Sequence, residues 1–233
     1  MSWLPIALWW WADFLIVPGV RVGPVDQKST ERALLALPGA GAKAAQIYMG
    51  EGFEEPGVVL YPDDPSRRLE VVWRGSPPAP AFVWICRGGK VPCRWRTAAG
   101  VSMGTTLKEL ERLNWKPFKM SGCCFDYAGS VVSFEDGKLA SYDQGLRLFL
   151  NLRTDGLSRE EIAPISGDRV ISSSHPVLQK LNPRIGVMRL DFPERPRPAH
   201  QGARSRQERA FSQGTQSPAC RTGELPWHAA TSN

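Results

Sequence analysis

Two adjacent cysteines, Cys123 and Cys124, are the residues best suited to covalent chemistry. With Asp126 close by and His175 elsewhere in the chain, they outline a thiol nucleophile and its base. Two small apolar side chains in a strand, followed by a turn at Asp126, explain the same residues without catalysis. That second interpretation is favoured because the chain has three histidines and two of them follow residue 192. We therefore expect no catalytic residue, and an enzyme that uses Cys123 or Cys124 is the alternative.

A cluster of carboxylates is the second candidate for chemistry. Its oxygens suit a hard cation, but the prolines among them are typical of a solvated loop. The five cysteines contain no CxxC pair and no Cys/His pair at zinc spacing, so we expect neither a metal nor a cofactor. Carboxylate chemistry in this region stays open as a second form of the enzyme alternative. The cluster comprises Glu51, Glu54, Glu55, Asp63 and Asp64.

Aromatic residues form the third candidate, a surface for recognition. Trp73, Trp84, Trp95 and Tyr127 are spread through the middle of the chain. Large aromatic side chains either fill a core or anchor a protein partner. The sequence is compatible with both.

A predicted hairpin would position two of these tryptophans. Residues 81–86 and 91–97 are strand-like and flank a glycine-rich turn. The register with a two-residue turn places Trp84 opposite Trp95 and Cys86 opposite Cys93, all on one face. Directly opposed cysteines are expected to form a disulfide if the compartment is oxidising.

The elements around these candidates repeat. Gly19 and Gly23 are echoed by Gly100 and Gly104, a spacing of 81 residues. Each pair precedes a predicted short amphipathic helix, at 29–37 and 106–113, and then a strand that enters an acidic turn, at 57–61 and 129–134. Matched order, type and spacing favour an internal duplication, with repeat one at 18–98 and repeat two at 99–192.

The remaining pattern completes an α+β fold of short helices packed on antiparallel strands. Asp136-Gly137 predicts a second hairpin, between 131–134 and 139–142. Thr106 with Glu109, and Ser158 with Glu161, are spaced as capping boxes, and a helix is expected to start at His175-Pro176. Strands are predicted at 146–152 and 184–192.

The two ends differ from the body. Residues 3–17 are apolar apart from Asp13 and too short for a comfortable membrane span. This leader, placed at 1–17, is typical of a degenerate export signal or membrane tether, or of a buried first strand. Residues 193–233 are rich in Pro, Arg, Gln and Ser, which predicts a disordered tail.

Composition and charge exclude several classes. The 42% hydrophobic and 22% charged content excludes a wholly disordered chain, a collagen and a coiled coil. Half of the net charge of +6 falls after residue 191, where six arginines are interspersed with three acids. Such dispersed charge is a weak footprint for nucleic acid, so we expect no nucleic-acid partner.

A family resemblance rests on residues 95–139. Gly100, Gly104, Leu107, Leu110, Asn114, Pro117 and Phe118 fit the pattern. The stretch resembles a family of uncharacterised bacterial proteins, many with export or lipoprotein signals. More distantly, it is similar to the tandem repeats of beta-lactamase inhibitory protein and of small outer-membrane assembly lipoproteins. Trp115 stands where that family has glycine, and Cys123-Cys124-Phe125 replaces an aromatic-rich stretch.

The resemblance implies a non-catalytic binding fold. The sequence is therefore interpreted as a non-enzymatic protein-binding or structural module of the bacterial cell envelope, located in the periplasm. Its aromatic face (Trp84, Trp95, and with them Trp73 and Tyr127) is expected to meet a protein partner. Alternatives are the enzyme described above and a cytoplasmic protein without a partner.

Overall fold

The computed structural model describes residues 14–88, 92–124, 127–154 and 156–194. All of them belong to one compact unit, Met1–Glu194. Most of the predicted leader and the predicted tail from residue 195 onward lie outside the described residues. The last three residues of the leader form strand β1 (Leu15–Val17), in which Ile16 is buried.

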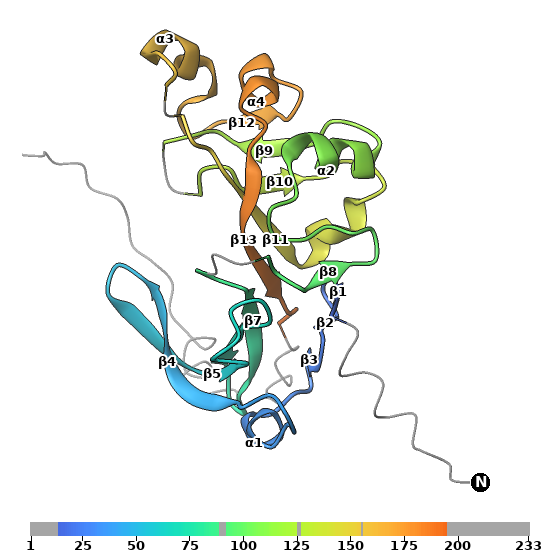
Figure 1. Ribbon diagram of the computed structural model, residues 1–233, viewed down its shortest axis with the longest axis vertical. Coiled ribbons are helices and arrows are strands. Elements are labelled where there is room, and N and C mark those ends of the chain that lie inside the picture. The colour runs from blue at the N-terminus through green and yellow to red at the C-terminus, as the bar shows by residue number, and fades with distance from the viewer. Residues whose placement is uncertain (1–13, 89–91, 125–126, 155, 195–233) are drawn as a thin grey trace, which may run out of the picture. The chain divides into compact units, whose positions relative to one another are not determined.

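A six-stranded antiparallel sheet dominates the unit, in the order β11-β13-β7-β6-β5-β4. Figure 1 shows β13, in orange to brown, reaching from the region of α4 down toward β7. β13, from the end of the described chain, therefore lies beside β7, which comes from a much earlier part of the sequence. The strands are β4 (Lys43–Gly50), β5 (Phe53–Leu60), β6 (Leu69–Arg74), β7 (Ala79–Ile85), β11 (Leu146–Asn151) and β13 (Arg184–Asp191).

Alternation of side chains along these strands builds two apolar layers. Leu69 and Val71 of β6, Val83 and Ile85 of β7, and Met188 of β13 join the main core on one face. On the other face Ile47, Val59 and Val72 form a smaller buried cluster, with Phe82 and Trp84 packed against it. Both faces of the sheet therefore carry apolar side chains.

Two small sheets and several short helices complete the α+β fold, as predicted. In one sheet β3 (Val25–Asp26), β2 (Arg21–Val22), β1 and β8 (Arg96–Thr97) lie in that order. In the other, β9 (Lys119–Ser121) lies between β10 (Val131–Ser133) and β12 (Val170–Ser172). The helices are α1 (Glu31–Leu35), α2 (Leu107–Asn114), α3 (Arg159–Ile162) and α4 (Pro176–Leu181), with 3-10 turns η2 (Ala140–Gln144) and η3 (Ala163–Ile165).

Local capping signals in the sequence are confirmed. Thr106 caps α2 and Ser158 caps α3, each in a complete capping box with Glu109 or Glu161. The Thr106 backbone N–H and hydroxyl that bind the Glu109 carboxylate hold its pKa below the usual value. His175 caps α4, where its Nδ1 accepts the Val177 backbone N–H at 3.3 Å. Each predicted helix therefore forms, although α1 is shorter than expected.

The predicted hairpin of residues 81–86 and 91–97 is wrong. β7 pairs with β6 and β13, so Trp84 lies opposite Glu70 and Arg189 rather than opposite Trp95. Cys86 has a φ of 49° and ends the strand, and the returning chain forms β8, which pairs with β1. A turn signal in the sequence specifies a reversal, but here the sheet supplies other partners for β7.

The second predicted hairpin is also wrong, because residues 140–144 form the 3-10 turn η2 instead of a strand. The side chain of Asn114, which is fully buried, determines this path. Its Nδ2 donates to the carbonyls of Lys116 and Phe134, and its Oδ1 accepts the Leu139 N–H at 3.0 Å. A Cβ on Gly137 would lie 2.1 Å from the Asn114 amide, so the loop passes Asn114 at a position that requires glycine. The helix end and the loop are thereby joined.

Strands from both predicted repeats share the large sheet. β4, β5, β6 and β7 come from 18–98, whereas β11 and β13 come from 99–192. The two strands predicted to correspond are in different sheets, β5 in the six-stranded one and β10 in the three-stranded one. Whatever their origin, the two segments fold around one core.

Trp115 caps the C-terminus of α2 in the left-handed conformation, with a φ of 66°, and is 75% exposed. A bulky residue is strained there, and glycine is not. We expect Trp115→Gly to raise the free energy of unfolding by about 1 kcal/mol, measured by urea denaturation. Trp115→Ala is the control, because it removes the ring and its contact with Lys138 but keeps the Cβ. Equal gains from both variants would contradict the strain.

Candidate functional site

A groove of about 760 Å³ lies on the face of the large sheet that carries Phe82 and Trp84, opposite the main core. It has room for a small ligand or for a few residues of a partner. Its lining includes Met49 of β4, Trp84 of β7, Tyr127 of the loop after β9, Phe149 of β11, Leu152 directly after β11, and Arg189 of β13.

The register of the sheet explains why these side chains meet. Directly opposite residues of antiparallel neighbours point to the same face. Trp84 of β7 is opposite Glu70 on one side and Arg189 on the other, and Arg189 is opposite Arg147 of β11. The same β11–β13 pairing places Phe149 opposite Val187. One row of side chains on this face therefore crosses four neighbouring strands: Glu70 of β6, Trp84 of β7, Arg189 of β13 and Arg147 of β11.

Two arginines lie against the Trp84 indole. The guanidinium carbons of Arg87 and Arg189 are 5.1 and 5.2 Å from the ring centroid, within cation–π distance. Phe82 is packed edge-on to the same indole, at 5.6 Å between centroids. The orientation of Trp84 is therefore fixed by its neighbours before any partner arrives.

Each of two carboxylates beside the indole is shared by two arginines. Glu70 lies 2.8 Å from Arg68 and 2.6 Å from Arg87. Asp191 lies 2.7 Å from Arg189 and 3.1 Å from Arg147. Among these described residues, four arginines therefore share two carboxylates.

The Trp84 Nε1 atom is buried and has no hydrogen-bond partner among the described residues. Leaving a buried donor unsatisfied costs about 1–3 kcal/mol. Because the atom has no exposed surface, an acceptor from a ligand reaches it only when the side chains that cover it move. The Trp73 Nε1 atom is in the same condition, but that ring packs on the main core.

The structure brings together half of the predicted aromatic residues. Trp84 and Tyr127 both line the groove, and Tyr127 is 77% exposed. Trp95 is completely buried, and Trp73 packs against the main core on the opposite side of the sheet. The predicted common face of all four does not form, because it depended on the hairpin register that the sheet overrides.

Most residues of the groove were not predicted as binding residues from the sequence, among them Met49, Phe149 and Arg189. Met49 and Phe149 contribute apolar surface and Arg189 contributes charge. The alternation in strands 146–152 and 184–192 signals which residues share a face, but only the strand order places them beside Trp84. That order requires pairing between residues about one hundred positions apart.

The two cysteines of the enzyme alternative also border the groove, but in different states. Cys123 is buried, and its Sγ lies 3.4 Å from the Ser166 hydroxyl. Burial raises the pKa of the Cys123 thiol, which favours the unreactive protonated form. Cys124 is exposed. Among the described residues no hydrogen bond links either thiol to His175, whose Nδ1 already caps α4.

The predicted acidic cluster is not gathered around a cation site. Glu54 and Glu55 are exposed on β5. Asp64 binds its own turn, accepting from Ser66 at 2.6 Å and Arg67 at 2.6 Å, and those bonds lower its pKa. In the part of the chain that the structure describes, no three His, Cys, Asp or Glu residues are arranged to hold a metal ion.

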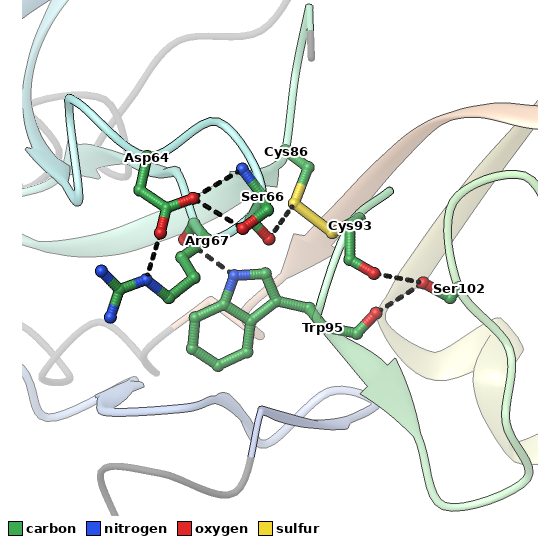
Figure 2. The surroundings of a disulfide bond; sticks show 7 residues. All are labelled: Asp64, Ser66, Arg67, Cys86, Cys93, Trp95 and Ser102. Atoms are coloured by element: carbon green, nitrogen blue, oxygen red, sulfur yellow. Dashed lines mark hydrogen bonds and ion pairs between the residues drawn. A yellow bond between two sulfur atoms is a disulfide. The ribbon is translucent and has the colours of Figure 1, made fainter. Parts of the chain in front are cut away.

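A disulfide joins Cys86 and Cys93 just beyond the end of β7, with 5.9 Å between their Cα atoms (Figure 2). The Cys86 backbone N–H donates to Arg68, and its Sγ lies 3.2 Å from the Ser66 carbonyl oxygen. The Arg94 backbone N–H donates to the same Ser66 carbonyl. The bridge therefore holds both of its ends against the turn at 64–68.

Trp95 extends this anchor into the core. Its Nε1 donates to the Arg67 carbonyl at 2.8 Å, and Ser102 donates to the Trp95 carbonyl at 2.7 Å (Figure 2). The ring packs edge-on against Phe14 and lies near Tyr61. Burial of Tyr61 raises the pKa of its hydroxyl, partly offset by Arg67.

The disulfide positions part of the groove through Arg87, the next residue after Cys86. Arg87 contacts the Trp84 ring, pairs with Glu70, and donates to the Tyr48 carbonyl of β4 at 2.6 Å. Tyr48 is followed by Met49 in the groove wall. Covalent restraint at Cys86 is thereby transmitted to two sides of the groove.

Known proteins offer no template for this arrangement. No protein-family model, no curated protein and no solved structure matches the chain. Within the described ranges, none of the helices has the length and apolar character needed to cross a membrane. The groove and the disulfide are therefore the basis of the functional inference.

Proposed function

We propose that this chain is a non-enzymatic protein-binding module of the bacterial cell envelope. Its partner binds in the groove lined by Trp84, Tyr127 and Phe149. The observation that carries the proposal is the Trp84 indole, which lines the groove, is contacted by two arginines, and has a buried N–H without a partner among the described residues.

The composition of the groove supports recognition of a protein. Tryptophan, tyrosine, phenylalanine, methionine and arginine are the residues enriched at protein interfaces, and tryptophan, tyrosine and arginine dominate their hot spots. All five types line this groove, as Trp84, Tyr127, Phe149, Met49 and Arg189.

The state of the Cys123 thiol and the position of His175 argue against the enzyme alternative. A cysteine nucleophile needs a thiolate and a base. The Cys123 pKa is raised by burial, and His175 is bonded to the backbone at the start of α4. These features favour binding over covalent chemistry.

The disulfide supports an oxidising compartment, as the periplasmic assignment requires. Such bridges persist in exported proteins and are rare in the cytosol. The resemblance of residues 95–139 to bacterial proteins with export signals favours the same location. In this proposal residues 1–13 contain the export signal or membrane tether, since residues 15–17 belong to β1.

We also infer that the two segments, 18–98 and 99–192, arose by duplication. Gly19, Gly23, Gly100 and Gly104 all have positive φ values. Each pair is followed by a helix capped by threonine, Thr30 for α1 and Thr106 for α2. The corresponding strands then diverged in pairing.

Site-specific photocrosslinking in the native host tests the binding proposal. A photoreactive phenylalanine analogue is placed at Phe149 or Tyr127 in the groove, and at exposed Val170 of β12 as the matched control. We expect one protein to crosslink from both groove positions and not from position 170. Trp84→Ala should reduce its yield at least about 30-fold, as for an interface hot spot. Equal crosslinking from position 170, or none from the groove, would contradict the proposal.

A further inference from the structure

We propose that the segment bound in the groove is acidic: an extended peptide in which an aromatic or aliphatic residue is followed within two positions by Asp or Glu. The inference rests on the proposed function and adds the chemistry of the partner. The apolar side chain packs on Trp84 and Phe149, and the carboxylate lies toward the arginines.

Charge selects the anion. Glu70 and Asp191 are each shared by two arginines, so among the described residues these four guanidinium groups have two carboxylates as ion-pair partners. Arg74, close by, is paired with Glu194. The Asp143 carboxylate is occupied by the Ser133 hydroxyl and the Phe134 N–H. A further carboxylate would complete the pairing, whereas a basic segment would face like charge.

The residues that line the groove also favour a negatively charged occupant. Arg189 is the charged residue among its described lining, and no described Asp or Glu lines it. The rest is apolar or aromatic apart from the two cysteines and Asn151. An occupant with apolar side chains and one acidic group would therefore add a carboxylate beside Arg189, whose present partner Asp191 is shared with Arg147.

The unpaired donor selects a peptide. Trp84 Nε1 has no acceptor among the described residues, and each residue of an extended peptide offers a backbone carbonyl that can accept its N–H once the side chains covering it move. Arg189 lies against the same indole, so an acceptor for the N–H and a carboxylate for the guanidinium are required close together. A peptide backbone next to an acidic side chain supplies both groups on one short segment.

The experiment starts with selection of peptides on the full chain. Random heptapeptides displayed on phage are enriched on the wild-type protein, and those that also bind Trp84→Ala are removed by counter-selection. The best groove-dependent peptide is synthesised with blocked ends in three versions, with Glu, Gln or Lys at the acidic position, and titrated by fluorescence anisotropy. We expect the Gln version to bind about tenfold more weakly and the Lys version at least about a hundredfold more weakly.

Variants of the protein separate charge from shape. Arg189→Met retains an apolar stem and should bring the Glu and Gln versions within about twofold of each other. Arg147→Gln, which is half exposed and acts through the shared Asp191, is the second variant in case Arg189→Met does not fold. Arg112→Gln on α2 is the matched control and should leave the tenfold preference unchanged. Trp84→Phe keeps an aromatic ring, although a smaller one, and removes the N–H, and should weaken every version about equally.

The outcomes distinguish the two levels of the proposal. Groove-dependent peptides that bind equally with Glu, Gln or Lys would overturn the acidic preference and leave the binding function standing. Octanoate that competes as strongly as the peptide does would overturn the peptide as occupant. Failure to select any peptide that Trp84→Ala weakens, together with absence of groove crosslinks, would overturn the proposed function itself.

Discussion

Trp95→Ala is expected to lower the free energy of unfolding by about 3–5 kcal/mol, the range for removing a large buried aromatic side chain. Trp95 is completely buried and its indole N–H is bonded to the Arg67 carbonyl. A Cβ on Gly23 would lie 2.5 Å from the Trp95 ring, so the backbone is packed directly against it. Truncation would leave a cavity that the neighbouring backbone cannot fill.

Urea denaturation followed by circular dichroism measures this effect. Trp95→Phe retains most of the ring but loses the bond to Arg67, so its loss should be smaller than that of the alanine variant. Val170→Ala, an exposed position on β12, should change stability by less than about 0.5 kcal/mol. A loss below about 1 kcal/mol for Trp95→Ala would show that Trp95 is not in the core.

Removal of the disulfide is the second large effect. For the short loop between Cys86 and Cys93, the chain-entropy relation gives a loss of about 2.5 kcal/mol for the double serine variant. A unit of this size should then unfold about 5–10 °C lower. Calorimetry of the wild-type protein with and without dithiothreitol should give the same difference as the double variant.

The control for this experiment is Cys124→Ser. Because Cys124 is an exposed free thiol, its replacement should leave both the melting temperature and the response to dithiothreitol unchanged. A double serine variant that melts with the wild type would mean that the turn at 64–68 holds residues 86 and 93 without help from the bridge.

Signals within one short segment account for what could be predicted of the fold. The capping boxes at Thr106 and Ser158 and the alternation of residues 184–192 involve residues a few positions apart, so the sequence displays them directly. The α+β class follows from those elements.

Pairing between distant segments accounts for the failures. The glycines after Cys86 suggest a local hairpin, but β7 has longer partners on both sides in β6 and β13. The buried Asn114 side chain likewise sets the path of residues 137–139 by accepting the Leu139 N–H. The two residues are 25 positions apart, so no local sequence pattern predicts this contact.

The candidate site shows the same division. Tryptophan and tyrosine are residue types that suggest recognition wherever they occur, so Trp84 and Tyr127 could be singled out. Trp95 has the same type but faces the core, because side-chain direction depends on register and not on residue type. Arg189 acquires its role solely from lying opposite Trp84.

The insertion of β13 has a consequence for how the chain folds during synthesis. β7 obtains its second neighbour only when residues 184–191 have left the ribosome, almost at the end of the described unit. Until then the β7 edge offers unpaired N–H and C=O groups beside Trp84 to any other strand. A nascent or truncated chain ending before Arg184 should therefore be the form most prone to aggregation, and the form that a chaperone holds.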